Sequence, residues 1–526
     1  MTTIGQLLEW SARNYPEKVA LIYREKNHVW TYEQFNAKAN QLAQALLKLG
    51  VKKGDVVSTF LYNTSEFALT LFASAKIGAI FNPINYRLTA NELHYILNNA
   101  ESKVLVFEDA VRDVVTKTKN LGTTVEHYLF VDQDLPDYAE DFEELLNSGE
   151  NVQPNVDVDE DDMYIMMYTS GTTGKPKGVL HRHRDMVHHG FLMMQCMGIT
   201  KNDIGLSAAP LNHTAELHTS FLPRVQCGAT NVILHHFDTE KVLKAIQDEK
   251  ITHMFAAPTM VNMMLNHKDF DKYDLSTLRL LGYGGASMAP VLIKRFLSKT
   301  NAELVQMLGT TEMGPVFTVL YSDEQLLKPG SAGKAIMTHE VKVVRLTEDG
   351  SPTHPDNECD IGEVGEIIVR GPCMMKEYYK REDATKKALA YGWYHTGDLG
   401  RVDEDGYIWV EDRMDFMINS GAENIYPREV EDNLLEHPSV AEVAVVGKPD
   451  EHWGEIVVAF VVVKEGENVT AEELDRFLIE GEKLAKYKRP REYYFVDSLP
   501  KTASGKIQKF VLERQLKEEV TASQQG

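Results

Sequence analysis

The chain alternates between two hydrophobic patterns up to about residue 306, and this alternation restricts the fold more than any other feature. Segments with apolar residues at helical spacing, such as Thr3–Asn14 and Thr31–Leu49, are followed by short apolar runs typical of strands, such as Val19–Tyr23 and Asp55–Tyr62. Strands that alternate with helices build a largely parallel sheet with helices on its faces. The sequence therefore predicts an α/β fold for this part of the chain.

The pattern changes twice further along. After about Gly330, short strands such as Glu340–Leu346 and Gly365–Arg370 are separated by Gly, Pro and Asp turns, which indicates a small antiparallel sheet or β-barrel. After Arg413, helical and strand patterns alternate over roughly a hundred residues, enough for a separate hydrophobic core. We therefore predict a large N-terminal domain, 1–413, of α/β subdomains plus a small β-barrel, followed by a small α+β domain, 414–526.

Composition excludes several classes of partner. The 526 residues carry a net charge of −23, which argues against nucleic acid because phosphate backbones repel it. No stretch reaches the roughly 18 apolar residues that a membrane span requires, and the N-terminus lacks the pattern of a secretory signal. The four cysteines form no Cys-x-x-Cys pair, which predicts reduced thiols in a cytoplasmic protein. One cluster is a locally basic exception: Lys175, Lys177, His181, Arg182, His183 and Arg184.

One run, Tyr168–Gly178, has the composition of a phosphate-binding loop. It follows the apolar segment Met163–Met167 and contains four small hydroxyl residues, three glycines and two lysines. Backbone N–H, hydroxyl and ammonium groups at the end of a strand suit a polyphosphate. The common P-loop is excluded, because Pro176 stands where that pattern has its second glycine. Seven residues are expected to contact the nucleotide: Thr169, Ser170, Gly171, Thr172, Thr173, Gly174 and Lys177.

This run and four further motifs resemble, in the same order, the signatures of the adenylate-forming enzymes, which include acyl-CoA synthetases, peptide-synthetase adenylation domains and luciferases. The four motifs are Gln306–Glu312, Tyr394–Leu399, Asp412–Asn424 and Pro500–Ile507. The resemblance covers essentially the whole chain and is greatest to a bacterial fatty-acyl-CoA ligase. It implies an acid–thiol ligase that uses ATP, Mg²⁺ and coenzyme A, and a C-terminal domain that moves between two half-reactions.

The resemblance also implies roles for single residues at the nucleotide. Thr311 would touch the α-phosphate, and Glu312 would hold the Mg²⁺ that accompanies ATP, since a carboxylate beside a triphosphate needs such an ion between them. Asp398 would accept hydrogen bonds from both ribose hydroxyls, with Arg413 beside it. Further nucleotide contacts are expected from four residues: Gly284, Gly285, Ala286 and Gln306.

Two half-reactions follow from the resemblance. Lys506 would bridge the acyl carboxylate and the α-phosphate during adenylation, because an ammonium between two anions stabilises the charge that develops on phosphorus. The small domain would then turn about Asp415, and the thiol of coenzyme A would release acyl-CoA and AMP. Contacts with the acyl group and coenzyme A are expected from six residues: His213, Ala215, Gly309, Ser420, Gly421 and Ala422.

Three positions bear on the ligands. His213 stands where amino-acid adenylation domains place an aspartate for the substrate amine, so an amino acid is not expected; relatives place this histidine at the carboxylate and thiol entrance, a catalytic position. Gly309 stands where acetate-specific relatives have a tryptophan, which predicts a pocket longer than acetate needs. Leu308 replaces an aromatic residue that stacks on adenine in many members. We predict a medium- or long-chain fatty acid, with an aromatic acid such as a cinnamate as the alternative.

Other functions stay open on the same scaffold. The acceptor could be a separate carrier protein, and luciferase-like oxidation is a third chemistry. A non-catalytic nucleotide-binding protein would be expected to have lost Lys506, Glu312 and Asp398, and all three are present. The expected partners are a small carboxylic acid, ATP and coenzyme A, with neither nucleic acid nor a membrane segment. The assembly stays open between monomer and homodimer.

Overall fold

The computed structural model of the chain describes residues 2–169, 176–286, 288–347, 350–413, 416–420, 423–450, 453–480, 484, 486–501 and 507–525. The chain divides into two compact units. The first comprises residues 1–341 with 369–394, and the second comprises residues 342–368 with 395–526. The domain boundary predicted after Arg413 stays a prediction.

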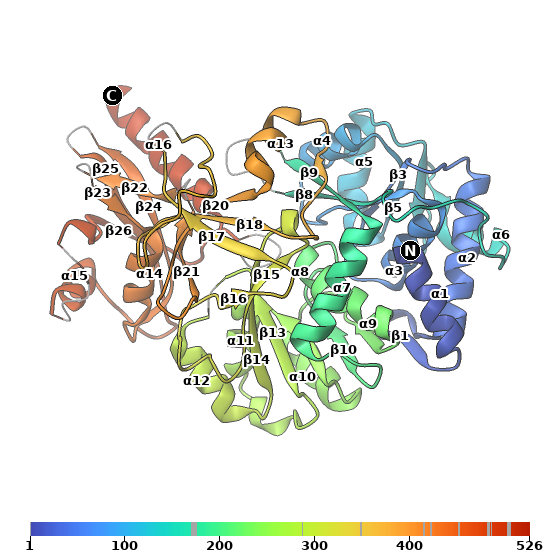
Figure 1. Cartoon of the computed structure of the whole chain (residues 1–526), viewed down its shortest axis with the longest axis horizontal. Helices are drawn as coiled ribbons and strands as arrows, with labels where there is room; N and C mark the ends of the chain where they lie inside the picture. Colours follow the sequence, from blue (N-terminus) through green and yellow to red (C-terminus); the bar gives the residue numbers. More distant parts are fainter. Residues whose placement is uncertain are drawn as a thin grey trace. The chain divides into compact units, whose positions relative to one another are not determined.

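The first unit contains two large, mainly parallel sheets (Figure 1). One has the order β19-β9-β8-β4-β3-β5-β6-β7 and is parallel from β8 to β7, with an antiparallel edge of β9 and β19. Its strands, in sheet order, are β19 (Glu377–Tyr378), β9 (Lys177–Arg182), β8 (Met163–Thr169), β4 (Ile80–Pro83), β3 (Val56–Phe60), β5 (Ser102–Phe107), β6 (His127–Phe130) and β7 (Glu140–Asp141).

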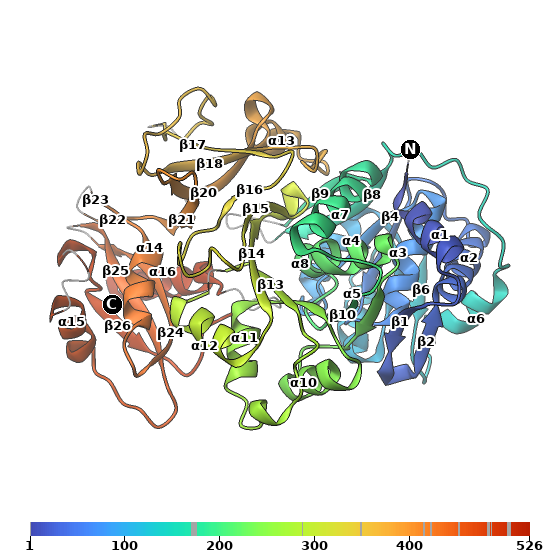
Figure 2. The ribbon, with the colours of Figure 1, turned by 60° about the horizontal axis from the view of Figure 1, so that its bottom comes forward.

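The second large sheet has the order β16-β15-β14-β13-β12-β10-β11-β1-β2, in which β14 to β1 are parallel (Figure 2). Its strands, in sheet order, are β16 (Lys334–Ala335), β15 (Val316–Leu320), β14 (Glu303–Gly309), β13 (Leu280–Gly284), β12 (His253–Ala256), β10 (Ile204–Ser207), β11 (Thr230–Ile233), β1 (Val19–Tyr23) and β2 (His28–Thr31). Parallel strands align their carboxyl ends along one edge of a sheet, where ligands bind in this fold class.

Helices pack on these sheets, and local capping starts several of them. The capping boxes Thr3/Gln6 and Thr31/Gln34 begin α1 and α2, as the spacing at Thr31 predicts. The helices of the first unit are α1 (Ile4–Asn14), α2 (Tyr32–Lys48), α3 (Ser65–Ile77), α4 (Ala90–Ala100), α5 (Arg112–Asn120), α6 (Phe142–Ser148), α7 (His183–Met197), α8 (Thr214–Glu216), the π-helix η3 (Leu217–Phe221), α9 (Leu222–Cys227), α10 (Thr239–Asp248), α11 (Pro258–Leu265), α12 (Pro290–Lys299) and α13 (Glu382–Ala388).

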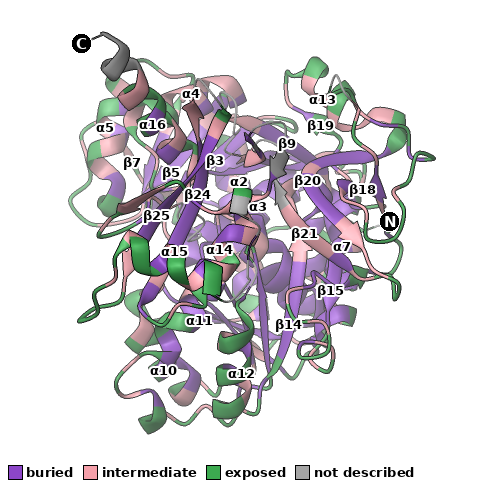
Figure 3. Ribbon diagram, turned by 90° about the vertical axis from the view of Figure 1, so that its left-hand side faces the viewer, coloured by how far each residue is buried: buried purple, intermediate pink, exposed green. Residues whose placement is uncertain are grey.

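The core of the first unit lies between the sheets and these helices. Every residue of α3 is buried, and α1 and α2 pack beside it. In contrast, α12 buries only Ile293 and Phe296 and is otherwise largely exposed in Figure 3. The four cysteines, all within the described residues, form no disulfide, as their scattered positions predict.

The second unit contains two smaller sheets. One has the order β17-β18-β20-β21, built from β17 (Glu340–Val344), β18 (Gly365–Arg370), β20 (Tyr394–Val402) and β21 (Ile408–Arg413). The other has the order β23-β22-β25-β24, with β26 paired to β25. Its elements are β22 (Ile418–Ser420), β23 (Glu423–Ile425), β24 (Val440–Asp450), β25 (Gly454–Val463), β26 (Glu492–Phe495), α14 (Pro427–Leu435), α15 (Ala471–Glu480) and α16 (Lys509–Gln525).

The α/β fold and the smaller α+β portion that follows it confirm the fold class predicted from the sequence. The small sheet expected after Gly330 is the four-stranded one that begins with β17. Across the described part of the chain, none of the helices combines the length and apolar character that a membrane crossing would need.

Candidate active site

Three of the residues predicted to contact ligand end parallel strands of the first unit. Thr169 ends β8, Gly284 ends β13 and Gly309 ends β14. Because the carboxyl ends of parallel strands form the usual ligand-binding edge, the fold places all three where such contacts are made. The hairpin of β8 and β9 brings Thr169 opposite Lys177 in register. Between them, the predicted contacts Ser170, Gly171, Thr172, Thr173 and Gly174 lie outside the described residues.

The turn after β14 carries Thr311 and Glu312, and a tyrosine from β19 holds the glutamate. The hydroxyl of Tyr378 donates to Oε1 of Glu312 across 2.7 Å, and both side chains are buried. The backbone N–H of Met375 donates to the carbonyl oxygen of Glu312, also across 2.7 Å. Nζ of Lys177 lies 4.3 Å from the centre of the Tyr378 ring. One tyrosine thus contacts both a predicted phosphate-binding lysine and the predicted Mg²⁺ ligand.

Thr311 is fixed through its backbone. Its carbonyl oxygen lies 2.7 Å from Nε2 of His181, on the strand that leaves the predicted phosphate loop. Neither His181 nor Tyr378 was expected to reach this turn. They lie 130 and 66 positions from their partners, and no motif spacing links either pair.

The locally basic cluster predicted after the loop is largely neutralised, and that expectation is wrong for four of its members. Burial lowers the pKa of His181, and burial lowers the pKa of His183 to about 4, so neither imidazole is charged at neutral pH. Arg182 pairs with Asp185 across 2.9 Å, and Arg184 pairs with Asp161 across 2.8 Å. Lys177, which begins β9, lies against the Tyr378 ring instead.

The predicted catalytic histidine, His213, caps the short helix α8. Its Nδ1 accepts a hydrogen bond from the backbone N–H of Ala215 across 3.2 Å, so the neutral ring carries its proton on Nε2. Two polar atoms, one on the residue before His213 and one on the residue before Thr311, are buried and have no hydrogen-bond partner among the described residues: Nδ2 of Asn212 and Oγ1 of Thr310. Such atoms can hydrogen-bond a ligand at no cost to the protein's own contacts.

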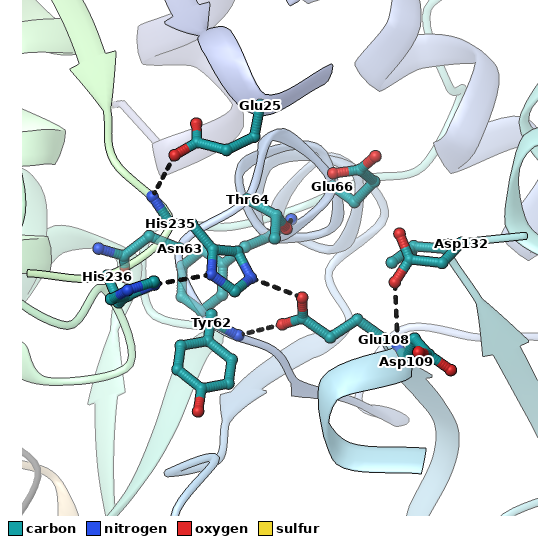
Figure 4. Close-up of polar contacts among 12 residues, drawn as sticks. Glu25, Tyr62, Asn63, Thr64, Glu66, Glu108, Asp109, Asp132, His235 and His236 are labelled. Atoms are coloured by element: carbon teal, nitrogen blue, oxygen red, sulfur yellow. Dashed lines mark hydrogen bonds and ion pairs between the residues drawn. The ribbon is translucent and has the colours of Figure 1, made fainter. Parts of the chain in front are cut away.

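A cluster of polar side chains fastens the loop before His213 to the other sheet. Oδ1 of Asn63, just after β3, accepts from the backbone N–H of Leu211 across 2.7 Å. Beside it, Glu108 accepts from the backbone N–H of Tyr62 across 2.5 Å and lies 2.7 Å from Nε2 of His235 (Figure 4). The rings of Tyr62 and His235 stack with their centres 4.6 Å apart. These contacts join the carboxyl ends of β3 and β5 in one large sheet to that of β11 in the other.

Two glycines at this edge are required by close backbone approach. A Cβ on Gly284 would lie 2.5 Å from the carbonyl oxygen of Met307 on the neighbouring strand. A Cβ on Gly309 would overlap the carbonyl oxygen of Pro315. Backbone packing alone therefore requires glycine at position 309. Gly309 is for this reason weaker support for a long acyl pocket than the sequence comparison suggests. Of the other residues predicted here, Gly285 and Ala286 are exposed, and Gln306 is buried and accepts from the Tyr283 hydroxyl across 3.0 Å.

The remaining predicted residues belong to the second unit. Asp398 on β20 is buried and pairs directly opposite the backbone of Arg413 on β21, so the structure brings these two positions together. Ser420 ends β22 and is buried. Within the last motif, Pro500–Ile507, Lys501 and Ile507 form an isolated antiparallel bridge. Asp415, Gly421, Ala422 and Lys506 lie outside the described residues.

Two family models match the chain: "AMP-binding enzyme" over residues 8–379 and "AMP-binding enzyme C-terminal domain" over residues 429–506. The chain belongs to the AMP-binding enzyme family. This membership confirms the resemblance to adenylate-forming enzymes that the five motifs carry.

Relatives of this AMP-binding enzyme match over nearly its full length. A putative acyl-CoA synthetase, YngI, of Bacillus subtilis (strain 168) is 35% identical over 97% of this chain and 96% of its own. The long-chain-fatty-acid–CoA ligase FadD13 of Mycobacterium tuberculosis (strain H37Rv) is 36% identical over 98% of this chain and 99% of its own. The crystal structure of the anthranilate CoA ligase AuaEII with anthranoyl-AMP superposes with a TM-score of 0.90 at 28% identity, covering 99% of this chain and 98% of that one.

Proposed function

We propose that this AMP-forming acid–thiol ligase activates a medium- or long-chain fatty acid as acyl-AMP, releases pyrophosphate, and transfers the acyl group to coenzyme A. The observation that carries the proposal is the buried Glu312, whose carboxylate is held by Tyr378, which in turn lies against Lys177. That arrangement supports a role for Glu312 at Mg²⁺ and for Lys177 at the phosphates, both within the first unit. It occurs in a chain whose relatives include a long-chain-fatty-acid–CoA ligase.

The nucleotide contacts are assigned from the family's motifs, separately for each unit. Lys177 and the loop from Thr169 would bind the β- and γ-phosphates, and Asp398 with Arg413 would bind the ribose. Among the described residues, no cluster of three or more His, Cys, Asp or Glu could hold a metal ion alone. Mg²⁺ would therefore enter with ATP, with phosphate oxygens completing its oxygen ligands beside Glu312. The ion would neutralise charge on the phosphates while the carboxylate attacks at the α-phosphorus.

The two half-reactions would use the small domain in two positions. Lys506 would bridge the acyl carboxylate and the α-phosphate in the first. In the second, the domain 414–526 would turn about Asp415, and the pantetheine chain would pass along Ser420, Gly421 and Ala422. Placement and charge neutralisation carry the chemistry, so no protein nucleophile is needed.

The neutral imidazole of His213 supports an acid without an ammonium group, because it offers no permanent negative charge to an amine. An aromatic acid is the second candidate, and the fold similarity to an anthranilate CoA ligase favours it. The unpaired buried atoms of Asn212 and Thr310 would suit the polar substituents of such an acid.

Pyrophosphate release with saturated acids from acetate to palmitate, and with cinnamate and anthranilate, tests the proposal. We expect the highest kcat/KM with acids of eight or more carbons, and thioester formation only when coenzyme A is added. A preference for acetate or an amino acid would refute the substrate assignment. Release of pyrophosphate without discharge by coenzyme A would instead point to a carrier-protein acceptor.

A further inference from the structure

Two buried histidines hold the two ends of the turn that carries Thr311 and Glu312. At its start, the carbonyl oxygen of Thr311 lies 2.7 Å from Nε2 of His181. At its end, the backbone N–H of Val316 donates to Nε2 of His189 across 3.3 Å. The exposed fractions of His181 and His189 are 1% and 0%, so water does not compete for either contact.

The two contacts require opposite tautomers. A neutral imidazole has one N–H group and one bare nitrogen. A carbonyl oxygen only accepts, so His181 carries its proton on Nε2; a backbone N–H only donates, so Nε2 of His189 is bare. Burial lowers the pKa of both imidazoles, that of His189 well below its ordinary value, which keeps both rings neutral at neutral pH.

Both histidines lie on the segment that leaves the predicted phosphate loop. His181 is on β9, which begins at Lys177, and His189 is on α7, which follows β9 directly. The same helix packs closely on the turn, because a Cβ on Gly314 would lie only 2.7 Å from Cε of Met186. Side chains of this one segment therefore hold the turn against β9 and α7, in addition to the contacts from Met375 and Tyr378.

We propose that His181 and His189 are positioning residues for adenylation. They act through the backbone of the turn and fix Thr311 and Glu312 relative to β9, the strand that begins at Lys177. The inference rests on the proposed roles of Thr311 at the α-phosphate and Glu312 at Mg²⁺. A histidine whose role is only to fill the core would affect stability without changing the adenylation step selectively.

The variants separate hydrogen bonding from packing. His181→Phe and His189→Phe keep a ring of similar size and remove the contact. His181→Gln and His189→Gln keep the hydrogen bond, because the amide nitrogen and oxygen of Gln are as many bonds from Cα as Nε2 of His. His253→Phe is the matched control: His253 is equally buried, at 0% exposure on β12, and neither ring nitrogen has a partner within the described part of the chain.

We expect each Phe variant to lower kcat for pyrophosphate release about five- to tenfold, the effect of one hydrogen bond, with KM for the acid within about twofold. The Gln variants should stay within about threefold of wild type. The double Phe variant should lose little more than the worse single one, because both contacts hold one turn. Thiolysis of supplied acyl-AMP should be unchanged, and His253→Phe should leave kcat within about twofold.

Wild-type kcat in both Phe variants, no rescue by Gln, or an equal loss in His253→Phe would each overturn the inference. Thermal unfolding identifies a variant that does not fold; His181→Asn, too short to reach Thr311, then replaces His181→Phe. If the wild-type protein releases no pyrophosphate with any acid, the proposed function fails separately. In that case, calorimetry measures the dissociation constant of Mg·ATP. Weaker binding in both Phe variants supports the inference, and unchanged binding overturns it.

Discussion

Replacing Tyr378 by Phe tests the arrangement on which the functional proposal depends. The change removes one oxygen and keeps the ring that lies against Lys177. The lost hydrogen bond, 2.7 Å long, ends on a carboxylate, and both side chains are buried, with exposed fractions of 4% for Tyr378 and 7% for Glu312. A buried hydrogen bond to a charged group contributes about 1.5–3 kcal/mol. We expect Tyr378→Phe to lower the free energy of unfolding by about that amount.

The neighbouring tyrosine supplies the control. The hydroxyl of Tyr379 donates to Glu101 across 3.1 Å at the protein surface, so Tyr379→Phe makes the same chemical change without burial. We expect a loss below about 0.5 kcal/mol for that variant. Urea unfolding measures both changes.

A kinetic measurement connects the same change to function. If Glu312 binds Mg²⁺, its carboxylate is no longer held in place in Tyr378→Phe, and Mg·ATP should bind more weakly. We expect KM for Mg·ATP to rise more than KM for the acid, by up to about tenfold for each 1.4 kcal/mol of binding free energy lost. Equal effects of Tyr378→Phe and Tyr379→Phe on unfolding would refute the hydrogen bond. An unchanged KM for Mg·ATP, with the stability loss present, would refute the assignment of Glu312 to the ion.

Four further predictions concern other parts of the chain. Arg224→Met should cost about 3–5 kcal/mol because it leaves the buried Glu216 unpaired, and adding Glu216→Leu should restore unfolding to within about 1 kcal/mol; additive losses in urea would contradict this. Burial raises the pKa of Glu216 from 4.5 to about 7, so folding takes up a proton between these pH values, and stability should fall by about 3 kcal/mol as pH rises through 7; that fall should be smaller in Glu216→Gln, measured at pH 5 and 8. Lys506→Ala should abolish pyrophosphate release and leave thiolysis of supplied acyl-AMP largely intact; equal loss of both would show that the role of Lys506 is wrong. Gly309→Ala should cost about 1–3 kcal/mol, because its Cβ would overlap Pro315; unfolding unchanged from wild type would count against this packing.

Local signals predicted most of the secondary structure. The capping box at Thr31 starts α2 one residue later, and the strand predicted at Gly365–Arg370 matches β18. Such features depend on neighbours within a few positions, so the sequence pattern is sufficient. The C-terminal helix α16 was not expected, although Leu512 and Leu516 have helical spacing and are buried.

The sequence pattern predicted the charge of the segment after the phosphate loop poorly. The run of basic residues after the phosphate loop predicts a positive patch, but burial keeps His181 and His183 neutral, and acidic partners pair with the two arginines. A residue's charge depends on what surrounds it after folding, and residues far along the chain supply those surroundings.

The sequence by itself determined the family, the order of the motifs and the chemistry that each could perform, because these depend on residue type and spacing. Tertiary structure alone decided which side chains hold those motifs in place. Tyr378 meets Glu312 because β19 pairs with β9, which sets Tyr378 opposite Val179 on the strand that leaves the phosphate loop. Sheet order and strand register bring such distant positions into contact. A local sequence pattern specifies neither the order nor the register.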